Sequence, residues 1–254
     1  MKNNKDGGSY NRGNMTRFDL HIHTALSACA ENIMSPGQIL SRAKDAGLDM
    51  MAITDHNASA NVSVSIRFGE NLGIKVIPGI EVTALEEVHF LGLFEKLEEL
   101  EDFQKLVDSA LPPGKNIAEI SGHQLVFDSG DEIIDVDENI RNIGLSLSSD
   151  RIISEIKKRN GYVIPAHIHK RIYSLVSQLG FIDPDAGFDA LEIAAPLWLR
   201  EGFKIGQRIE GYPVISGSDS HFLESVGRFH MEIPETADSL KGLMDLIKSG
   251  SSGH

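Results

Sequence analysis

Residues 18–24 read Phe18-Asp19-Leu20-His21-Ile22-His23-Thr24, a short apolar run that ends in two histidines. Side chains two residues apart in an extended strand point to the same side. Both imidazoles can therefore reach one metal ion. A second stretch, Ala52-Ile53-Thr54-Asp55-His56, repeats the pattern of an apolar strand followed by polar side chains. These stretches predict strands whose ends carry metal ligands.

Strands and helices alternate along the rest of the chain. Pro36 near the start and Gly47 after the end delimit one helix, because proline favours the first turn and glycine the position after the last. We expect helices over 36–46, 60–72, 97–107, 150–160 and 237–248, and strands over 18–22, 48–54, 74–77, 88–94, 162–166, 190–194 and 213–216. This alternation predicts βα units and a largely parallel sheet. The number of strands favours an α/β barrel over an open sheet.

The chain of 254 residues, 41% of them hydrophobic, is long enough for one barrel domain, which we expect over residues 17–248. Residues 1–16 are polar, without the apolar region of a signal peptide, and predict a disordered leader. Residues 249–254 predict a flexible tail. Residues 111–147 break the rhythm of the barrel and predict a small insertion with a hairpin over 126–134.

Composition limits the partners and the compartment. The single cysteine excludes an intramolecular disulfide and favours the cytoplasm. We expect no membrane association, because no apolar run reaches the length of a transmembrane helix. The net charge of −13 argues against long duplex nucleic acid and anionic lipid. Acidic side chains that bind metal ions can nevertheless leave a locally positive site.

Metal-ligand side chains recur at one predicted end of the barrel, where α/β barrels carry their active sites. The candidates are His21, His23, His56, Glu81, His89, His167, Asp219 and His221. One histidine at a strand end is more often a hydrogen-bonded core residue than a ligand. Burying this whole set together without an ion would cost several kcal/mol in unpaired groups and charge repulsion. The set therefore predicts a polynuclear metal centre.

The chain resembles the PHP family, the polymerase and histidinol phosphatase superfamily of metal-dependent phosphoesterases. The resemblance covers residues 17–233 and rests on the motifs Asp19-Leu20-His21-Ile22-His23-Thr24, Ala52-Ile53-Thr54-Asp55-His56-Asn57, Pro78-Gly79-Ile80-Glu81, His89-Phe90-Leu91-Gly92, Ala166-His167 and Ser218-Asp219-Ser220-His221. It implies a distorted seven-stranded β/α barrel, the (β/α)7 fold of the PHP type, with a trinuclear metal centre.

The resemblance also implies a ligand set. His21, His23, Glu81 and Asp219 would hold the first ion. Glu81 would bridge to a second ion, which His89 and His167 would also hold. His56 and His221 would hold the third ion. The family often completes this third site with a residue shortly after the first motif. Here Ala28 cannot bind, and Cys29 is the expected substitute, with Glu31 behind it.

Imidazole and carboxylate ligands suit two or three ions of zinc, iron or manganese. Such ions would activate a water molecule for attack on phosphorus. The sequence thus predicts a hydrolase of phosphate esters, acting on a small phosphomonoester, a nucleotide or a short oligonucleotide end. Histidinol phosphate is an alternative substrate that the resemblance offers. Because of Ala28, a non-catalytic metal-binding regulatory module is the alternative from another class.

Several further residues are candidates with a structural alternative. His169, Lys170 and Arg171 follow His167 directly and would bind substrate phosphate, or else form a solvated loop. We expect catalytic roles for Asp55, Arg171 and Arg228. Asp55 would orient a metal-bound histidine or carry a proton, or else only form a turn.

Overall fold

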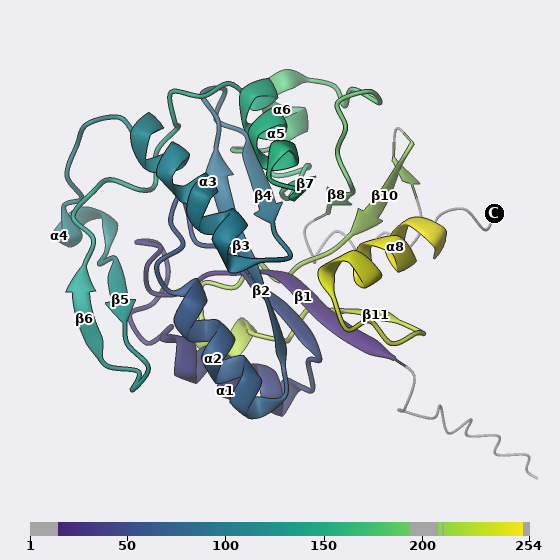
Figure 1. Ribbon diagram of the computed structural model, residues 1–254. Coiled ribbons are helices and arrows are strands. Elements are labelled where there is room, and N and C mark those ends of the chain that lie inside the picture. Colours follow the sequence, from purple (N-terminus) through teal and green to yellow (C-terminus); the bar gives the residue numbers. More distant parts are fainter. Residues whose placement is uncertain (1–14, 194–207, 210, 251–254) are drawn as a thin grey trace, which may run out of the picture.

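The computed structural model describes residues 15–193, 208–209 and 211–250 (Figure 1). Most of the predicted leader and tail lies outside these residues. Strand β1 (Thr16–Ile22) begins within the predicted leader, because Thr16 pairs with Ile233 of β11 (Met231–Ile233). Helix α8 (Leu240–Gly250) extends into the predicted tail. Regular secondary structure thus extends beyond both predicted bounds of the domain, residues 17 and 248.

The main sheet has six strands in the order β11, β1, β2 (Met50–Ile53), β3 (Lys75–Thr83), β4 (His89–Leu93) and β7 (Tyr162–Pro165). Strands β1, β2 and β3 are parallel, but β4 is antiparallel to both of its neighbours. The prediction of a largely parallel sheet is wrong at β4 and at β11, which pairs antiparallel with β1. The connection 84–88 is too short for a crossover and forms a hairpin instead. The first residue of β4, His89, consequently pairs with Thr83 at the end of β3.

A second sheet continues the wall, with the order β8 (Leu191–Glu192), β10 (Tyr212–Ile215) and β9 (Arg208–Ile209). The Asp189 amide, two residues before β8, donates to the Val163 carbonyl in β7, and the His23 amide donates to the Ser220 carbonyl after β10. One buried cluster lies within this ring of strands and comprises Phe18, Leu20, Met50, Ala52, Ile77, Leu91, Leu93, Ile164, Ala166, Ala190 and Ile215 together with β11 and α8 residues. The two sheets of the wall thus enclose one core, which confirms the predicted distorted barrel.

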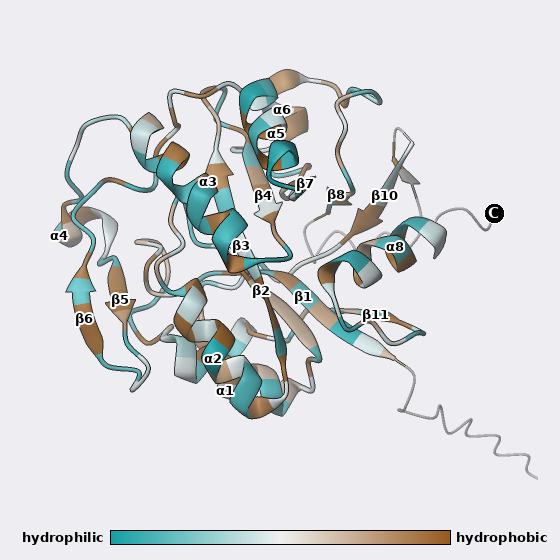
Figure 2. Ribbon diagram, in the orientation of Figure 1, coloured by the Kyte–Doolittle hydropathy of each residue, from teal (hydrophilic) through white to brown (hydrophobic). Residues whose placement is uncertain are grey.

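Helices cover the outside of this wall. They are α1 (Pro36–Ala46), α2 (Val62–Leu72), α3 (Leu97–Ala110), α5 (Ser149–Lys158) and α6 (Leu175–Leu179), and a short 3-10 helix η2 (Leu223–Ser225) follows β10. Helix α1 has the predicted bounds, with the Ser35 hydroxyl accepting from the Gln38 amide at one end and Gly47 at φ 76° at the other. Apolar helix faces pack inward and polar faces point outward (Figure 2). No helix among the described residues is long and apolar enough to cross a membrane.

The segment 111–147 forms α4 (Ala118–Ser121) and the hairpin of β5 (Leu125–Phe127) and β6 (Ile133–Val136), as the sequence predicts for the hairpin. It is anchored to the loop after β1, because the Leu125 amide donates to the Ala25 carbonyl. Gly122 has φ +97°, and a Cβ there would lie 1.9 Å from the Ala28 carbonyl oxygen. Only glycine permits this approach. The segment 111–147 therefore packs against the backbone of Ala28, the residue before Cys29.

A prediction for acid stability follows from Glu155 on α5. Its carboxylate lies 2.9 Å from Arg151, 2.7 Å from Lys158 and 2.6 Å from Arg159. Hydrogen bonds from Lys158 and Arg159 lower its pKa from 4.5 to about 2. Because the folded pKa is the lower one, the ionised form stabilises the fold above pH 4.5, and this stabilisation is lost as the pH falls toward 2.

Urea unfolding of the wild type and Glu155→Gln between pH 7 and pH 2 measures this effect. We expect the wild type to be the more stable protein near neutral pH and to lose that advantage at acid pH. A difference in free energy of unfolding that does not change with pH would contradict the assignment.

Candidate metal centre

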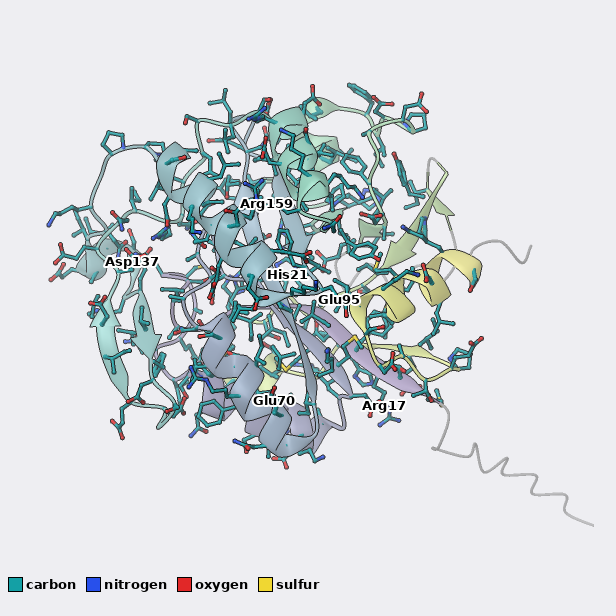
Figure 3. The ribbon with its side chains drawn as sticks, in the orientation of Figure 1. Arg17, His21, Glu70, Glu95, Asp137 and Arg159 are labelled. Carbon is teal, nitrogen blue, oxygen red and sulfur yellow. The ribbon has the colours of Figure 1, made fainter. Side chains whose placement is uncertain are left out.

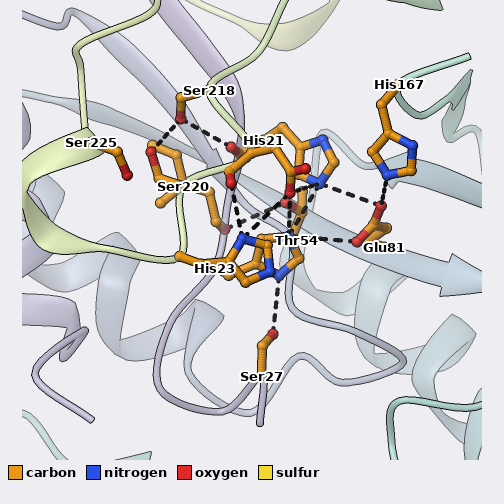
Figure 4. Close-up of polar contacts among 12 residues, drawn as sticks. His21, His23, Ser27, Thr54, Glu81, His167, Ser218, Ser220 and Ser225 are labelled. Atoms are coloured by element: carbon orange, nitrogen blue, oxygen red, sulfur yellow. Dashed lines mark hydrogen bonds and ion pairs between the residues drawn. The ribbon is translucent and has the colours of Figure 1, made fainter. Parts of the chain in front are cut away.

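A β-bulge in β1 turns the first two histidines toward the barrel interior. Phe18 and Leu20 belong to the inner core, whereas Ile22 belongs to the outer core that the helices cover. The register of β1 against β2 shifts between Asp19 and Ile22, which explains the change of side. His21 and His23 flank Ile22 and face inward, and both are fully buried. Their Nε2 atoms lie 3.1 Å apart (Figure 4).

Glu81 on β3 lies at the centre of the histidines. Its Oε1 is 2.9 Å from His89 Nδ1, 3.2 Å from His167 Nε2 and 3.4 Å from His21 Nε2. Its Oε2 is 2.8 Å from His56 Nδ1 and 3.4 Å from His23 Nε2. The antiparallel direction of β4 brings His89 to this edge, and the isolated bridge between residues 56 and 81 brings His56. One carboxylate thus contacts five imidazoles from four segments of the chain.

Asp219 closes the site from the segment after β10. Its Oδ1 lies 3.4 Å from His21 Nε2 and 3.3 Å from His23 Nε2. The other oxygen accepts from the Lys170 ammonium. Although burial opposes ionisation, the charges of His21 and His23 hold the pKa of Asp219 well below its ordinary value. A carboxylate that stays ionised beside two imidazoles is a suitable metal ligand.

His56 and His221 form the third predicted pair. With His23 they offer three ring nitrogens that lie within 4.8 Å of one another. Cys29 is exposed and lines one cavity together with His221 and His56. Burial raises the pKa of its thiol, but the two imidazoles lower it more strongly, so that the pKa falls from 9.0 to about 6. The Glu31 side chain is exposed, and only its amide contacts His221, at the carbonyl.

The donor set fits metal ions. Two further groups lie within 4.8 Å, His21 with His23 and Glu81, and His56 with Glu81 and His89. Among the described residues, His89 Nε2 and His167 Nδ1 are buried without a hydrogen-bond partner, while the other ring nitrogen of each faces Glu81. Buried polar atoms are normally paired, so these two point to a missing ligand. Burial lowers the pKa of His89 to about 4, which keeps that imidazole neutral and able to coordinate.

Outer partners fix the ring orientations. His23 Nδ1 lies 3.0 Å from Ser27 Oγ, which donates to Asp55, so the ring donates through Nδ1 and leaves Nε2 free. His21 Nδ1 lies 2.9 Å from Glu192 Oε2. The sequence interpretation missed Ser27 and Glu192, although Glu192 is a carboxylate at the end of an apolar strand, the signal used elsewhere. Asp55 accepts a hydrogen bond from Ser27 Oγ, which in turn contacts the His23 ring.

Several site residues have strained backbones. His167 has φ 33° and Asp219 has φ 50°, and Asn57 next to His56 has φ 48°. Non-glycine residues rarely adopt this region unless the surrounding structure holds them there. The Asn57 amide does so by donating to the carbonyls of Arg141 and Ile143. Three of the seven non-glycine residues with positive φ in the described part of the chain thus lie at or next to candidate ligands.

A cavity of about 220 Å³ opens onto the cluster and is lined by Cys29, His56, His89, Asn142, His167, Lys170, Ile172, Tyr173, Asp219 and His221. Of the three predicted phosphate-binding residues, Lys170 lines this cavity. His169 and Arg171 are exposed, and Arg228 lies over the Phe229 ring; in the described part of the chain these three do not line this cavity. His21 lies at the centre of the molecule, with Arg17, Glu70, Glu95, Asp137 and Arg159 around it (Figure 3).

Residues 19–160, more than half of the chain, match the PHP domain family, and residues 208–252 match the PHP-associated family. The chain therefore belongs to the PHP domain family, which confirms the resemblance seen in the sequence. It is also similar in fold to solved structures. These include a novel lesion-specific endonuclease from Pyrococcus furiosus (TM-score 0.59, 18% identity, 92% of this chain and 56% of that chain) and a proposed metal-dependent phosphoesterase from Bifidobacterium adolescentis (TM-score 0.54, 17% identity, 91% and 95%).

Curated relatives match a shorter part. Phosphoribosyl 1,2-cyclic phosphate 1,2-diphosphodiesterase of Eggerthella lenta is 35% identical over 30% of this chain and 29% of its own length. A 5'-3' exoribonuclease of Haemophilus influenzae is 30% identical over 32% of this chain and 30% of its own length. The chain thus matches less than a third of each of these relatives. Both are named as enzymes that cleave phosphate ester bonds, the class that the sequence predicts.

Proposed function

We propose that this protein is a metal-dependent phosphoesterase that hydrolyses a small phosphomonoester or a nucleotide phosphate. The observation that carries the proposal is the convergence of six imidazoles, Glu81 and Asp219 at the floor of one cavity. His21, His23, Glu81 and Asp219 would hold one ion, Glu81, His89 and His167 a second, and His56, His221 and Cys29 a third. Bound divalent ions would polarise phosphate oxygens and activate a water molecule.

The chain's own residues supply binding and charge. The Lys170 ammonium lines the cavity, and the charge of Asp219 raises its pKa against the effect of burial, so it stays cationic. It can pair with a phosphate oxygen, while Asp219 keeps it directed at the cluster. The volume of about 220 Å³ suits a phosphoryl group with a small substituent, in contrast to a continuous duplex. This size favours a small phosphomonoester or the phosphate at the end of a short chain.

A phosphodiester is the second candidate substrate. Curated relatives that match about a third of this chain are named as a cyclic-phosphate diphosphodiesterase and as 5'-3' exoribonucleases, so their names favour a diester or the end of a short oligonucleotide. Duplex DNA has less support, because the net charge of −13 opposes a long polyanion.

Product release from a panel of substrates tests the proposal. The panel contains phosphomonoesters, histidinol phosphate, mononucleotides, a cyclic nucleotide and a short 5'-phosphorylated RNA, each with added Mn²⁺ or Zn²⁺ and again with a chelator. We expect metal-dependent release from the small monoesters or nucleotides. Cleavage confined to the cyclic compound or the RNA would favour the diester. Bound metal without any release would favour the non-catalytic module.

Cys29 is the residue to test for the third ion, because its thiolate would favour a soft ion there. In the cobalt-loaded wild type we expect a thiolate-to-cobalt charge-transfer band, which Cys29→Ser should abolish while weakening one ion's affinity by about tenfold or more. Ser109→Ala on the exposed side of α3 is the control. A spectrum unchanged by Cys29→Ser would exclude the thiolate as a ligand.

A further inference from the structure

Glu192 contacts candidate ligands of two different ion positions, His21 of the first and His167 of the second. It ends β8 and is 1% exposed. Its Oε2 lies 2.9 Å from His21 Nδ1 and also accepts from the His167 amide at 2.9 Å. The Oε1 atom lies 3.1 Å from the same ring nitrogen of His21. A single buried carboxylate therefore contacts the ring of one candidate ligand and the backbone of another.

Each contact has a distinct physical consequence. The carboxylate only accepts, so His21 must donate through Nδ1, which leaves Nε2 free to face Glu81 and Asp219. At His167, the bond from the amide to a charged acceptor stabilises a backbone with φ 33°. This holds the imidazole near Glu81, at 3.2 Å from Oε1.

The surrounding chain leaves room for this carboxylate. Gly217 lies against it, and a Cβ at that position would be 2.3 Å from Glu192 Oε1 and 2.8 Å from the His21 Cβ. A side chain at residue 217 would therefore displace the carboxylate or the ring. Glycine at this position is required for the contact between Glu192 and His21.

We propose that Glu192 is a positioning residue that couples the first and the second ion positions, by orienting the ring of His21 and holding the backbone of His167. The inference rests on the proposed metal-dependent function. It separates Glu192 from Ser27, which bonds the ring of His23 and accepts from the His56 amide, and so contacts no candidate ligand of the second position.

Zinc affinity tests the coupling. Glu192→Gln keeps the shape and one acceptor oxygen but removes the charge. We expect the dissociation constants of two zinc ions, measured by competition with a chromophoric chelator, to rise about 10- to 100-fold. Glu155→Gln on α5, the same chemical change at a residue outside the cluster, should weaken neither. Unchanged affinities in Glu192→Gln, or weakening of a single ion, would overturn the inference.

A measurement on the wild type covers the case in which Glu192→Gln does not fold. In zinc-loaded protein with ¹⁵N-labelled histidine, we expect His21 to be the tautomer protonated at Nδ1 and coordinated through Nε2. Protonation at Nε2 would overturn the inference. A wild type that binds no zinc would instead overturn the proposed function, and the inference with it.

Discussion

Glu81→Gln should lower phosphoesterase activity by roughly 10³-fold, which corresponds to about 4 kcal/mol of transition-state stabilisation. Glu81 is fully buried and lies within 3.4 Å of the imidazoles of His21 and His23, which would bind the first ion together with Glu81. The amide of glutamine preserves the shape but carries no negative charge. Two ions held close together then lose the anion that balances them, so both metal affinity and activity should fall.

The matched control is Glu132→Gln, which makes the same chemical change at an exposed position in the turn before β6. It should leave activity and metal content unchanged. Metal content of Glu81→Gln, measured by mass spectrometry after dialysis, should fall together with the rate. A variant with full metal content and full activity would refute the central role of Glu81.

Removal of metal should produce the second large effect, a loss of activity together with a loss of thermal stability. Ligands that bind only the folded state stabilise it, by about 2.7 kcal/mol per site at one hundred times the dissociation constant. For a chain of this size, that free energy corresponds to a shift in Tm of roughly 5–10 °C per site. We therefore expect a chelator to lower the Tm by at least this amount and to abolish phosphate release.

Readdition of Mn²⁺ or Zn²⁺ should restore both properties. Calorimetry with and without the chelator, compared between the wild type and Glu81→Gln, separates specific binding from an effect of the chelator on the solvent. The variant should respond less. Activity that survives complete removal of metal would refute the proposed function, and an equal shift in Tm in both proteins would place the ions elsewhere.

The ligand residues could be predicted from local sequence because their chemistry is local. The alternation in His21-Ile22-His23 puts two imidazoles on one side of a strand, and an apolar run before His56 or His167 marks the end of another strand. Helix α1 has the predicted bounds because Ser35, Pro36 and Gly47 determine them within a few residues. None of these signals depends on the rest of the chain.

The outer partners of the ligands depend on distant residues. Glu192 lies 171 residues from His21, so no local pattern relates the two. The same applies to Asn142, which the segment 111–147 brings to the cavity. Arg171 and Arg228 show the converse case. Both are suitable phosphate-binding residues, yet the fold turns Arg171 to solvent and directs Arg228 to Phe229.

The sequence by itself therefore identified the candidate metal ligands and, for His23, His56 and His167, the strand ends that carry them, because strand periodicity and helix boundaries are properties of neighbouring residues. It did not place Glu81 inside β3 or His89 at the start of β4. Only the tertiary structure decided how these ends meet around Glu81, which buried groups orient them and which cations reach the cavity. These features arise from hydrogen bonds and packing between segments far apart in the chain, and they form only when the barrel closes between residues 22 and 220.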